Sequence, residues 1–337
     1  MDRFFGLFGV AAILLIAYSL SNNRKAISWR VVSSGLALQL SLALFILKTE
    51  PGRWIFLEIG NFIKLILAFS DKGGEFVFGS LLSSADLVQK VFGIPGQYLF
   101  ALKVMPTIIF VAVLVSIAYH RGIMQRVVAF VAKIVYKLIG VSGSAALSNV
   151  ASAFVGQVEA QIMIKPYVPS MTMSELLTSM AGSMACIAGG VMAVYIGMGV
   201  PAPYLLAASV MAAPAAIVIA KIVYPETEES ETRGEVKLEI TKTYVNVLDA
   251  IAHGASDGMR ISINVIAMLI GFIALIAMID GVLAWIGHII IHFTGITAFL
   301  GIDLNHLSLN AILGALFSVF AILMGVPFKD ASSVGAL

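Results

Sequence analysis

The chain has 337 residues, of which 60% are hydrophobic and 12% are charged, and its formal net charge is +2. Soluble domains carry about 25% charged residues, so this composition excludes an ordinary soluble protein and indicates a polytopic helical membrane protein. The mean hydropathy of +0.99 agrees. No patch combines basic with aromatic residues, so no nucleic-acid partner is expected. A single cysteine, Cys186, excludes an intramolecular disulfide.

The first apolar run, residues 5–20, predicts a membrane helix. The basic residues Arg24, Lys25 and Arg30 follow this run. Basic residues favour the cytoplasmic side, so the N-terminus is expected outside. A cleaved signal peptide is the alternative, but it would place the basic residues before the apolar run.

The next segments continue this topology. Residues 31–47 predict a return span, and residues 49–97 contain two interrupted apolar runs, 54–69 and 76–92, which we expect to be interfacial helices. Residues 98–119 predict a third span. A basic segment then belongs to the cytoplasm, because it carries His120, Arg121, Arg126, Lys133 and Lys137. The expected regions are an N-terminal scaffold at 1–97 and a span with this basic segment at 98–140.

Residues 152–169 are unusually polar for a membrane segment, since they contain Gln157, Glu159, Gln161 and Lys165. A carboxylate at the bilayer centre costs about 2.5–3.5 kcal/mol, so it is kept where it faces a partner or a watery cavity. Small residues precede the segment, and Pro166 and Pro169 close it. We expect a re-entrant hairpin that presents Gln157 and Glu159 to a polar ligand. A cytoplasmic loop with a solvated glutamate is the alternative.

Residues 172–175 predict a capped helix start. The span that follows, 176–200, contains Gly189-Gly190, which indicates either an unwound helix or close helix packing. Residues 204–223 predict a returning span. The hairpin and these spans form an expected transport region at 141–224, and the polar segment 225–243 is expected to be a solvated cytoplasmic linker.

Residues 244–293 predict one long scaffold helix, whose first half has a polar face made of Asp249, His253, Asp257 and Arg260. His288 and His292 share a helix face near its end and are better explained as interfacial residues than as a metal site. Residues 294–337 contain a second polar-studded apolar run, 307–326. Two hairpins that enter from opposite sides are typical of inverted-repeat transporters. The expected fold class is therefore all-α and polytopic, with two oppositely oriented re-entrant hairpins.

Four stretches resemble the concentrative nucleoside transporter family. They are VMPTIIF at 104–110, the basic segment with Gly122-Ile123-Met124, the run 152–200 that begins with SAFVGQVEAQIMIKPYVP, and FSVFAILMGVPFKDASSVGAL at 317–337. The similarity covers most of the chain from about residue 98 onward. It implies a homotrimer in the lipid bilayer that imports nucleosides through a mobile transport domain, driven by a sodium or proton gradient, without an enzymatic cofactor.

The resemblance also implies a substrate site. Family members typically read G-Q-T-E where this chain has Gly156, Gln157, Val158 and Glu159. Gln157 and Glu159 match positions that hydrogen-bond the nucleobase, and Val191 matches an apolar position that lines the base pocket. Val158 departs from the family's Thr or Ser. The lost hydroxyl is worth about 0.5–1.5 kcal/mol if it bonded the ligand.

The implied sodium position comprises Ser152, Val155, Cys186 and Ile187, with Val155 and Ile187 acting through backbone carbonyls. Sodium-coupled members usually carry Asn in place of Ser152, and Ser or Thr in place of Cys186. Sodium is a hard cation that prefers oxygen ligands, whereas a thiol is soft. These departures predict proton coupling or weak sodium coupling. Glu159 is the candidate proton carrier, because burial raises the pKa of a carboxyl group.

Family members continue past the second hairpin with two helices that bind the ribose, and their motifs do not occur in this sequence. The residues above are therefore expected to form half of a site. A transporter of a nucleobase or another polar solute is an alternative, as is a structural scaffold. An intramembrane enzyme using Glu159 with Lys165 or His120 is disfavoured, because no catalytic motif accompanies them. The expected location is a bacterial inner membrane, with a periplasmic N-terminus.

Overall fold

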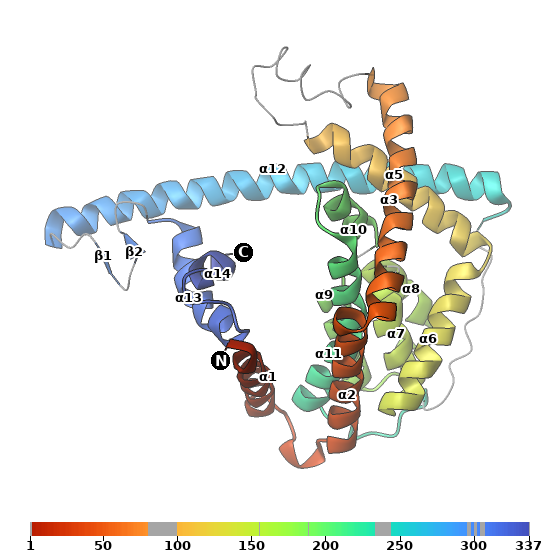
Figure 1. The fold of residues 1–337 in the computed structure, drawn as a ribbon, viewed down its shortest axis with the longest axis horizontal. Coiled ribbons are helices and arrows are strands. Elements are labelled where there is room, and N and C mark those ends of the chain that lie inside the picture. Colours follow the sequence, from red (N-terminus) through yellow and green to blue (C-terminus); the bar gives the residue numbers. More distant parts are fainter. Residues whose placement is uncertain are drawn as a thin grey trace. The chain divides into compact units, whose positions relative to one another are not determined.

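A computed structural model describes residues 2–79, 100–154, 156–187, 189–232, 244–294, 298–299, 302–303 and 307–336. These residues form helices almost throughout, with one pair of two-residue strands. They divide into two compact units, residues 21–264 and residues 1–20 together with 265–337. Figure 1 labels the elements of both units. The predicted all-α polytopic fold class is confirmed.

The larger unit contains both predicted regions of interest, the basic segment and the first hairpin. Its helices are α2 (Trp29–Lys48), α3 (Glu50–Phe78), α5 (Phe100–His120), α6 (Ile123–Ile139), α7 (Gly143–Phe154), α8 (Gln157–Ile164), α9 (Met173–Ala185), α10 (Gly189–Gly197), α11 (Ala202–Val223) and the start of α12 (Val247–Thr294). Among the described residues of this unit, two short 3₁₀ helices occur: η1 (Arg24–Ala26) precedes α2, and η3 (Lys165–Ser170) follows α8.

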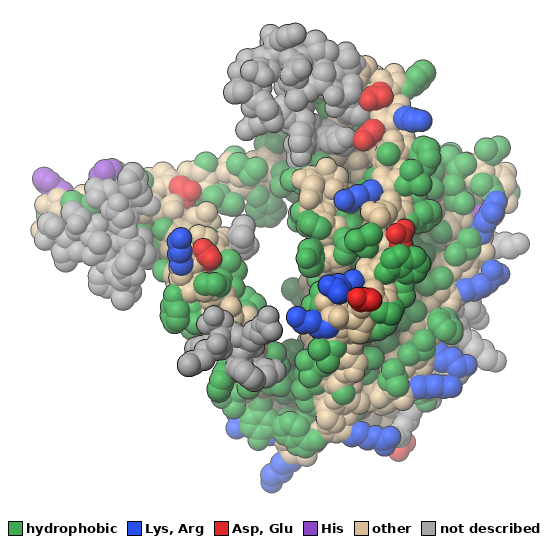
Figure 2. Space-filling view, viewed as in Figure 1, with side chains coloured by type: hydrophobic (Ala, Val, Ile, Leu, Met, Phe, Trp, Pro, Cys, Tyr) green, Lys and Arg blue, Asp and Glu red, His purple; other side chains and the backbone are tan. Residues whose placement is uncertain are grey.

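Helix α6 shows how sequence pattern becomes packing in this unit. Val128, Ala132, Val135 and Ile139 recur at helical spacing and are buried, where they join α7 in the main apolar core. The basic side chains of α6 lie on its other face and follow the helix down the right-hand side of Figure 2. Because Lys and Arg favour the cytoplasmic side, this amphipathic helix is expected to lie at that membrane surface.

Three described helices are long and apolar enough to cross a membrane: Trp29–Lys48, Ala202–Val223 and Val247–Phe293. A fourth candidate is the pair α5 and α6, which are bent by 77° relative to each other. Gly122, with a φ of +67°, lies at this bend. Glycine adopts this left-handed conformation at little cost, so the chain turns there between the predicted third span and the basic segment.

Helix α3 contains the first of the two interrupted apolar runs. It continues from Glu50 to Phe78, so it includes run 54–69 and the first three residues of run 76–92. Ser70 and Gly74 are buried where α3 packs against α5, and the Ser70 Oγ lies 3.4 Å from the Thr107 Oγ1. Packing therefore sustains the helix through its polar middle. The rest of the second run lies outside the described residues.

The smaller unit contains α1 (Asp2–Ser19), the remainder of α12, β1 (Ala298–Phe299), β2 (Ile302–Asp303), α13 (Leu309–Leu323) and α14 (Ala331–Ala336). Helices α13 and α14 pack closely, since a Cβ on Gly335 would lie 2.6 Å from the Ser318 nitrogen. Helix α1 approaches α13 just as closely, because a Cβ on Gly9 would lie 1.7 Å from the Leu323 carbonyl oxygen. The second predicted hairpin is therefore a pair of packed helices.

Candidate functional site

The first arm of the predicted hairpin is α7, a helix enclosed by protein. Residues 143–153 are all buried, and most of them are small. The Asn149 Nδ2 donates to the carbonyl oxygens of Ala145 and Thr178, at 2.9 and 3.1 Å. A Cβ on Gly182 would lie 2.0 Å from the Asn149 Oδ1, so α9 can approach α7 this closely only because residue 182 is glycine.

The hairpin turns at Gly156. Its φ of +139° and ψ of 164° are conformations that residues with a Cβ rarely adopt, and Gly156 is the N-cap of α8. Helix α8 then runs to Ile164, where η3 and its prolines end the hairpin. The turn therefore lies near the start of the predicted 152–169 segment, and α7 supplies an arm that begins earlier in the chain.

The predicted substrate residues lie along α8 and at the start of α10. Gln157 is exposed and lines a groove of about 590 Å³ with Gln161, Ile162, Lys165 and Ser183. The backbones of Val158 and Glu159 belong to α8, but their side chains lie outside the described part of the structure. Val191 is 42% exposed. The assignment of these residues to a substrate site stays a prediction.

The predicted cation residues surround the break between α9 and α10. Helix α9 ends at Ala185, and Cys186 is extended with a φ of −99° and a ψ of 149°. The break therefore comes just before Gly189-Gly190, which begin α10, whereas the sequence left open whether these glycines unwind the helix or allow close packing. Cys186 and Ile187 are half-buried. Ser152 is fully buried, and its Oγ donates to the Ser148 carbonyl oxygen at 2.8 Å.

A polar contact network joins the two arms of the hairpin to α9. The Ser152 Oγ lies 3.3 Å from the Ser183 Oγ, and the Gln161 Nε2 donates to Ser183 at 2.7 Å and to Ser179 at 3.0 Å. Sequence analysis recognised Gln161 as polar but missed Ser179 and Ser183. Their spacing of four residues puts both hydroxyls on one face of α9, which is the signal that could have identified them.

A second polar network surrounds Glu175 in the first turn of α9. The predicted cap is confirmed as a capping box, in which Thr172 accepts from the Glu175 N–H at 3.2 Å and Glu175 accepts from the Thr172 N–H at 2.9 Å. The other carboxylate oxygen accepts hydrogen bonds from Ser230 and from Thr232, the latter at 2.8 Å. Glu175 is fully buried.

The environment of Glu175 determines its ionisation. Burial raises the pKa of this carboxyl group, but hydrogen bonds from Ser142, Ser230, the Thr172 N–H and Thr232 together outweigh burial and hold the pKa below its usual value of 4.5. Glu175 is therefore a buried carboxylate held by neutral donors.

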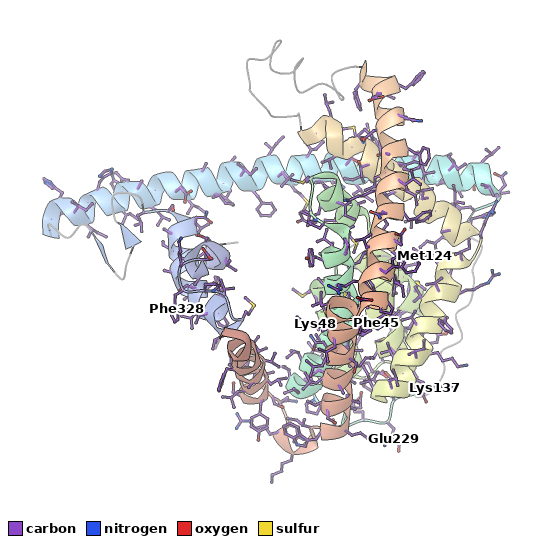
Figure 3. All side chains as sticks on the ribbon, viewed as in Figure 1. Phe45, Lys48, Met124, Lys137, Glu229 and Phe328 are labelled. Atoms are coloured by element: carbon purple, nitrogen blue, oxygen red, sulfur yellow. The ribbon has the colours of Figure 1, made fainter. Side chains whose placement is uncertain are left out.

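This network corrects the prediction for the polar linker, which was expected to be solvated throughout. Its first part, residues 225–232, packs on the unit, because Ser230 and Thr232 bond Glu175, and Lys221 donates to Glu226 at 2.9 Å. The composition of the linker does not show which of its polar side chains have buried partners. Residues 233–243 lie outside the described residues. The packed segment borders a cavity of about 720 Å³, whose lining includes Lys137 and Glu229 (Figure 3).

The donor atoms near the break in α9 fit sodium poorly. Ser152 offers a single hydroxyl oxygen, and Cys186 offers a soft thiol. Val155 lies outside the described residues. A re-entrant hairpin beside a broken helix, inside a bundle of apolar spans, is an arrangement that defines a class of secondary membrane transporters.

Comparison with known proteins specifies this class. Three family descriptions match successive parts of the chain. They are "Na+ dependent nucleoside transporter N-terminus" at residues 8–81, "Nucleoside recognition" at 101–202, and "Na+ dependent nucleoside transporter C-terminus" at 204–337.

Individual relatives agree with the family descriptions. The chain is 38% identical to an uncharacterized transporter of Bacillus subtilis over 337 residues, which is 78% of that protein. It is 35% identical to the nucleoside permease NupC of Helicobacter pylori over 333 residues, or 99% of this chain and 75% of the relative. Sodium/nucleoside cotransporter 1 of Rattus norvegicus is 36% identical over 98% of this chain, which spans 47% of that protein.

A solved structure of CNTnw in an inward-facing substrate-bound state has a TM-score of 0.89 and 38% sequence identity, covering 100% of this chain and 75% of that one. The chain belongs to the concentrative nucleoside transporter family. Members of this family carry out cation-coupled nucleoside transport in the membrane, so the prediction that the chain is not an enzyme is confirmed.

Proposed function

We propose that this protein imports nucleosides by proton symport, with the hairpin α7–α8 and the break between α9 and α10 as its binding and coupling centre. The choice of a proton over sodium rests on the side chains available at Ser152 and Cys186. They provide one hydroxyl oxygen and one thiol, where a hard cation prefers several oxygens. A proton needs no such set of ligands, and Glu159 on α8 is the proposed carrier.

The proposed base site consists of Gly156, Gln157, Val158, Glu159 and Val191. Gln157 supports this assignment, because its amide is exposed in the groove and can both donate and accept, as a nucleobase edge requires. We further propose that residues 141–224 move as a transport domain in an elevator-type cycle. The protein is expected to be a homotrimer of a bacterial inner membrane with a periplasmic N-terminus, which agrees with the basic cytoplasmic surface proposed for α6.

Sodium coupling is the second candidate, because relatives of this chain are named sodium/nucleoside cotransporters. Uptake of radiolabelled uridine into proteoliposomes separates the two. We expect uptake when a proton gradient is imposed without sodium, and no stimulation by a sodium gradient at fixed pH. Uptake that stops when sodium is removed at fixed pH would overturn the proton assignment while leaving nucleoside transport intact.

A double substitution sharpens the same experiment. Ser152→Asn with Cys186→Ser replaces a short hydroxyl by an amide and a thiol by a hydroxyl, so both positions then offer oxygen to a hard cation. We expect sodium to stimulate uptake by this variant and not by the wild type. Ser70→Ala, which removes a buried hydroxyl from α3, serves as the control and is expected to respond to ions as the wild type does.

A further inference from the structure

Gln161 links the second arm of the hairpin, α8, to α9 through hydrogen bonds. Its Nε2 donates to the Ser183 Oγ at 2.7 Å and to the Ser179 Oγ at 3.0 Å, and the Ser179 Oγ donates back to the Gln161 Oε1 at 3.1 Å. Both ends of the amide are therefore used. A side chain bonded through both of its polar atoms is fixed in orientation as well as in position.

The hydrogen bonds continue from α9 to α7, the first arm of the hairpin. The Ser183 and Ser152 oxygens lie 3.3 Å apart, and Ser152 gives its own proton to the Ser148 carbonyl oxygen. Ser183 must then be the donor in their contact, so the hydrogen bonds run in one direction, from Gln161 through Ser183 and Ser152 to Ser148. One amide on α8 thus orients the hydroxyl at the predicted cation position on α7.

Apolar packing alone does not place α8 along α9. The buried residues among the described side chains of α8 are Ala160, Met163 and Ile164, and they belong to the main apolar core with α6 and α7, against which Leu176 of α9 also packs. Burial of apolar surface is non-directional and tolerates sliding. Among the described side chains of α8, Gln161 is the one with hydrogen bonds to α9.

The position of Gln161 also determines that of Gln157. The two residues are four apart on α8, so they share one helix face, and both line the groove of about 590 Å³ together with Ser183. A displacement of α8 relative to α9 would move the proposed base-binding amide by the same amount.

We propose that Gln161 is a positioning residue for nucleoside binding. It holds α8 in register with α9, so that the hairpin presents Gln157 to the base while Ser152 stays oriented at the coupling position. This inference rests on the proposed function, since it assigns to Gln161 a role at the same site. It predicts that loss of the amide weakens binding without contact between Gln161 and the nucleoside.

Equilibrium binding of radiolabelled uridine to the purified full-length gene product tests the inference. Gln161→Leu is expected to raise the Kd about tenfold, the size of effect that follows from losing one or two net hydrogen bonds. Ser70→Ala removes a buried hydroxyl from α3 and is expected to leave the Kd unchanged. A wild-type Kd for Gln161→Leu would overturn the inference.

Gln161→Glu supplies a readout that a merely structural role would not produce. A protonated carboxyl keeps an acceptor and one of the two donors of the amide, whereas the carboxylate has acceptors only and cannot donate to Ser183. The ratio of mutant to wild-type Kd should therefore be lower at pH 4, near the ordinary pKa of about 4.3 for a glutamic acid, than at pH 8, where it should be about ten. A ratio that does not change with pH would contradict the inference. Using the ratio removes any pH dependence of the wild type itself.

Hydrogen–deuterium exchange separates this inference from the proposed function. Gln161→Leu is expected to increase amide exchange in residues 157–164, and Ser70→Ala is not, whether or not uridine binds. A wild-type protein that does not bind uridine would overturn the proposed function, while the exchange data would still decide whether Gln161 holds α8. Unchanged exchange in Gln161→Leu would overturn the positioning role.

Discussion

Two polar networks in the larger unit differ in how they meet solvent. The network around Glu175 closes the carboxylate itself off from solvent, because Glu175 is fully buried and its donors among the described residues, on Ser142, Thr172, Ser230 and Thr232, are all neutral. Ser142 and Ser230, at the edge of this network, also line the cavity of about 720 Å³. The network around Gln161 is open, because it borders a groove where Gln157 is exposed. A closed network stabilises architecture, whereas an open one leaves donors and acceptors for a ligand. Substitutions should therefore affect stability at one network and binding at the other.

The largest effect is expected for Glu175→Ala. The change removes half of the capping box and leaves Ser230 and Thr232 without their acceptor, so unfolding should become easier by about 3 kcal/mol. Thermal unfolding in detergent measures this loss. Glu229→Ala, at an exposed position of the same segment, is the control and should unfold as the wild type does. Equal melting temperatures for both variants would show that the network is not structural.

Gly182→Ala tests the close packing of α9 against α7. The new Cβ would lie 2.0 Å from the Asn149 Oδ1, so α7 and α9 must separate or Asn149 must give up its hydrogen bonds. We expect a loss of about 2 kcal/mol in unfolding free energy. Gly197→Ala adds the same methyl group to α10 where no atom lies within 4 Å, and it should be tolerated. The prediction fails if both variants have the same stability.

Gln157→Ala should produce the opposite pattern. Its side chain is exposed, so the melting temperature should stay within the error of the wild type, while the Kd for uridine should rise about tenfold. Met173→Ala truncates another exposed side chain, on α9, and should change neither quantity. A fall in stability without a change in Kd would place Gln157 in the architecture instead of the proposed base site.

The smallest expected effect is a pH dependence of stability. Because the folded state lowers the pKa of Glu175 below its usual 4.5, the contribution of this carboxylate is complete above pH 4.5 and is lost as pH falls through the folded-state pKa. The melting temperature of the wild type should thus fall more steeply below pH 4.5 than that of Glu175→Gln, which cannot titrate at this position. Parallel curves for the two proteins would contradict the assignment.

The comparison also shows where sequence patterns sufficed. The Thr172-to-Glu175 spacing predicted the capping box, because a cap involves residues within one helical turn. The polar stretch with its closing prolines predicted the first hairpin, although the turn at Gly156 lies near the beginning of that stretch. Local spacing did not show how far α3 extends beyond run 54–69, because the burial of Ser70 against α5 is a tertiary contact.

The sequence by itself determined the membrane class, most helix positions, the cap of α9 and the family to which the chain belongs. Only the tertiary structure decided that Gln161 forms hydrogen bonds with Ser179 and Ser183. It also decided that two linker residues, Ser230 and Thr232, donate hydrogen bonds to Glu175. The reason is physical. Spacing shows which side chains share one face of a helix, but the face of another segment that meets them depends on how all the buried surfaces pack at once.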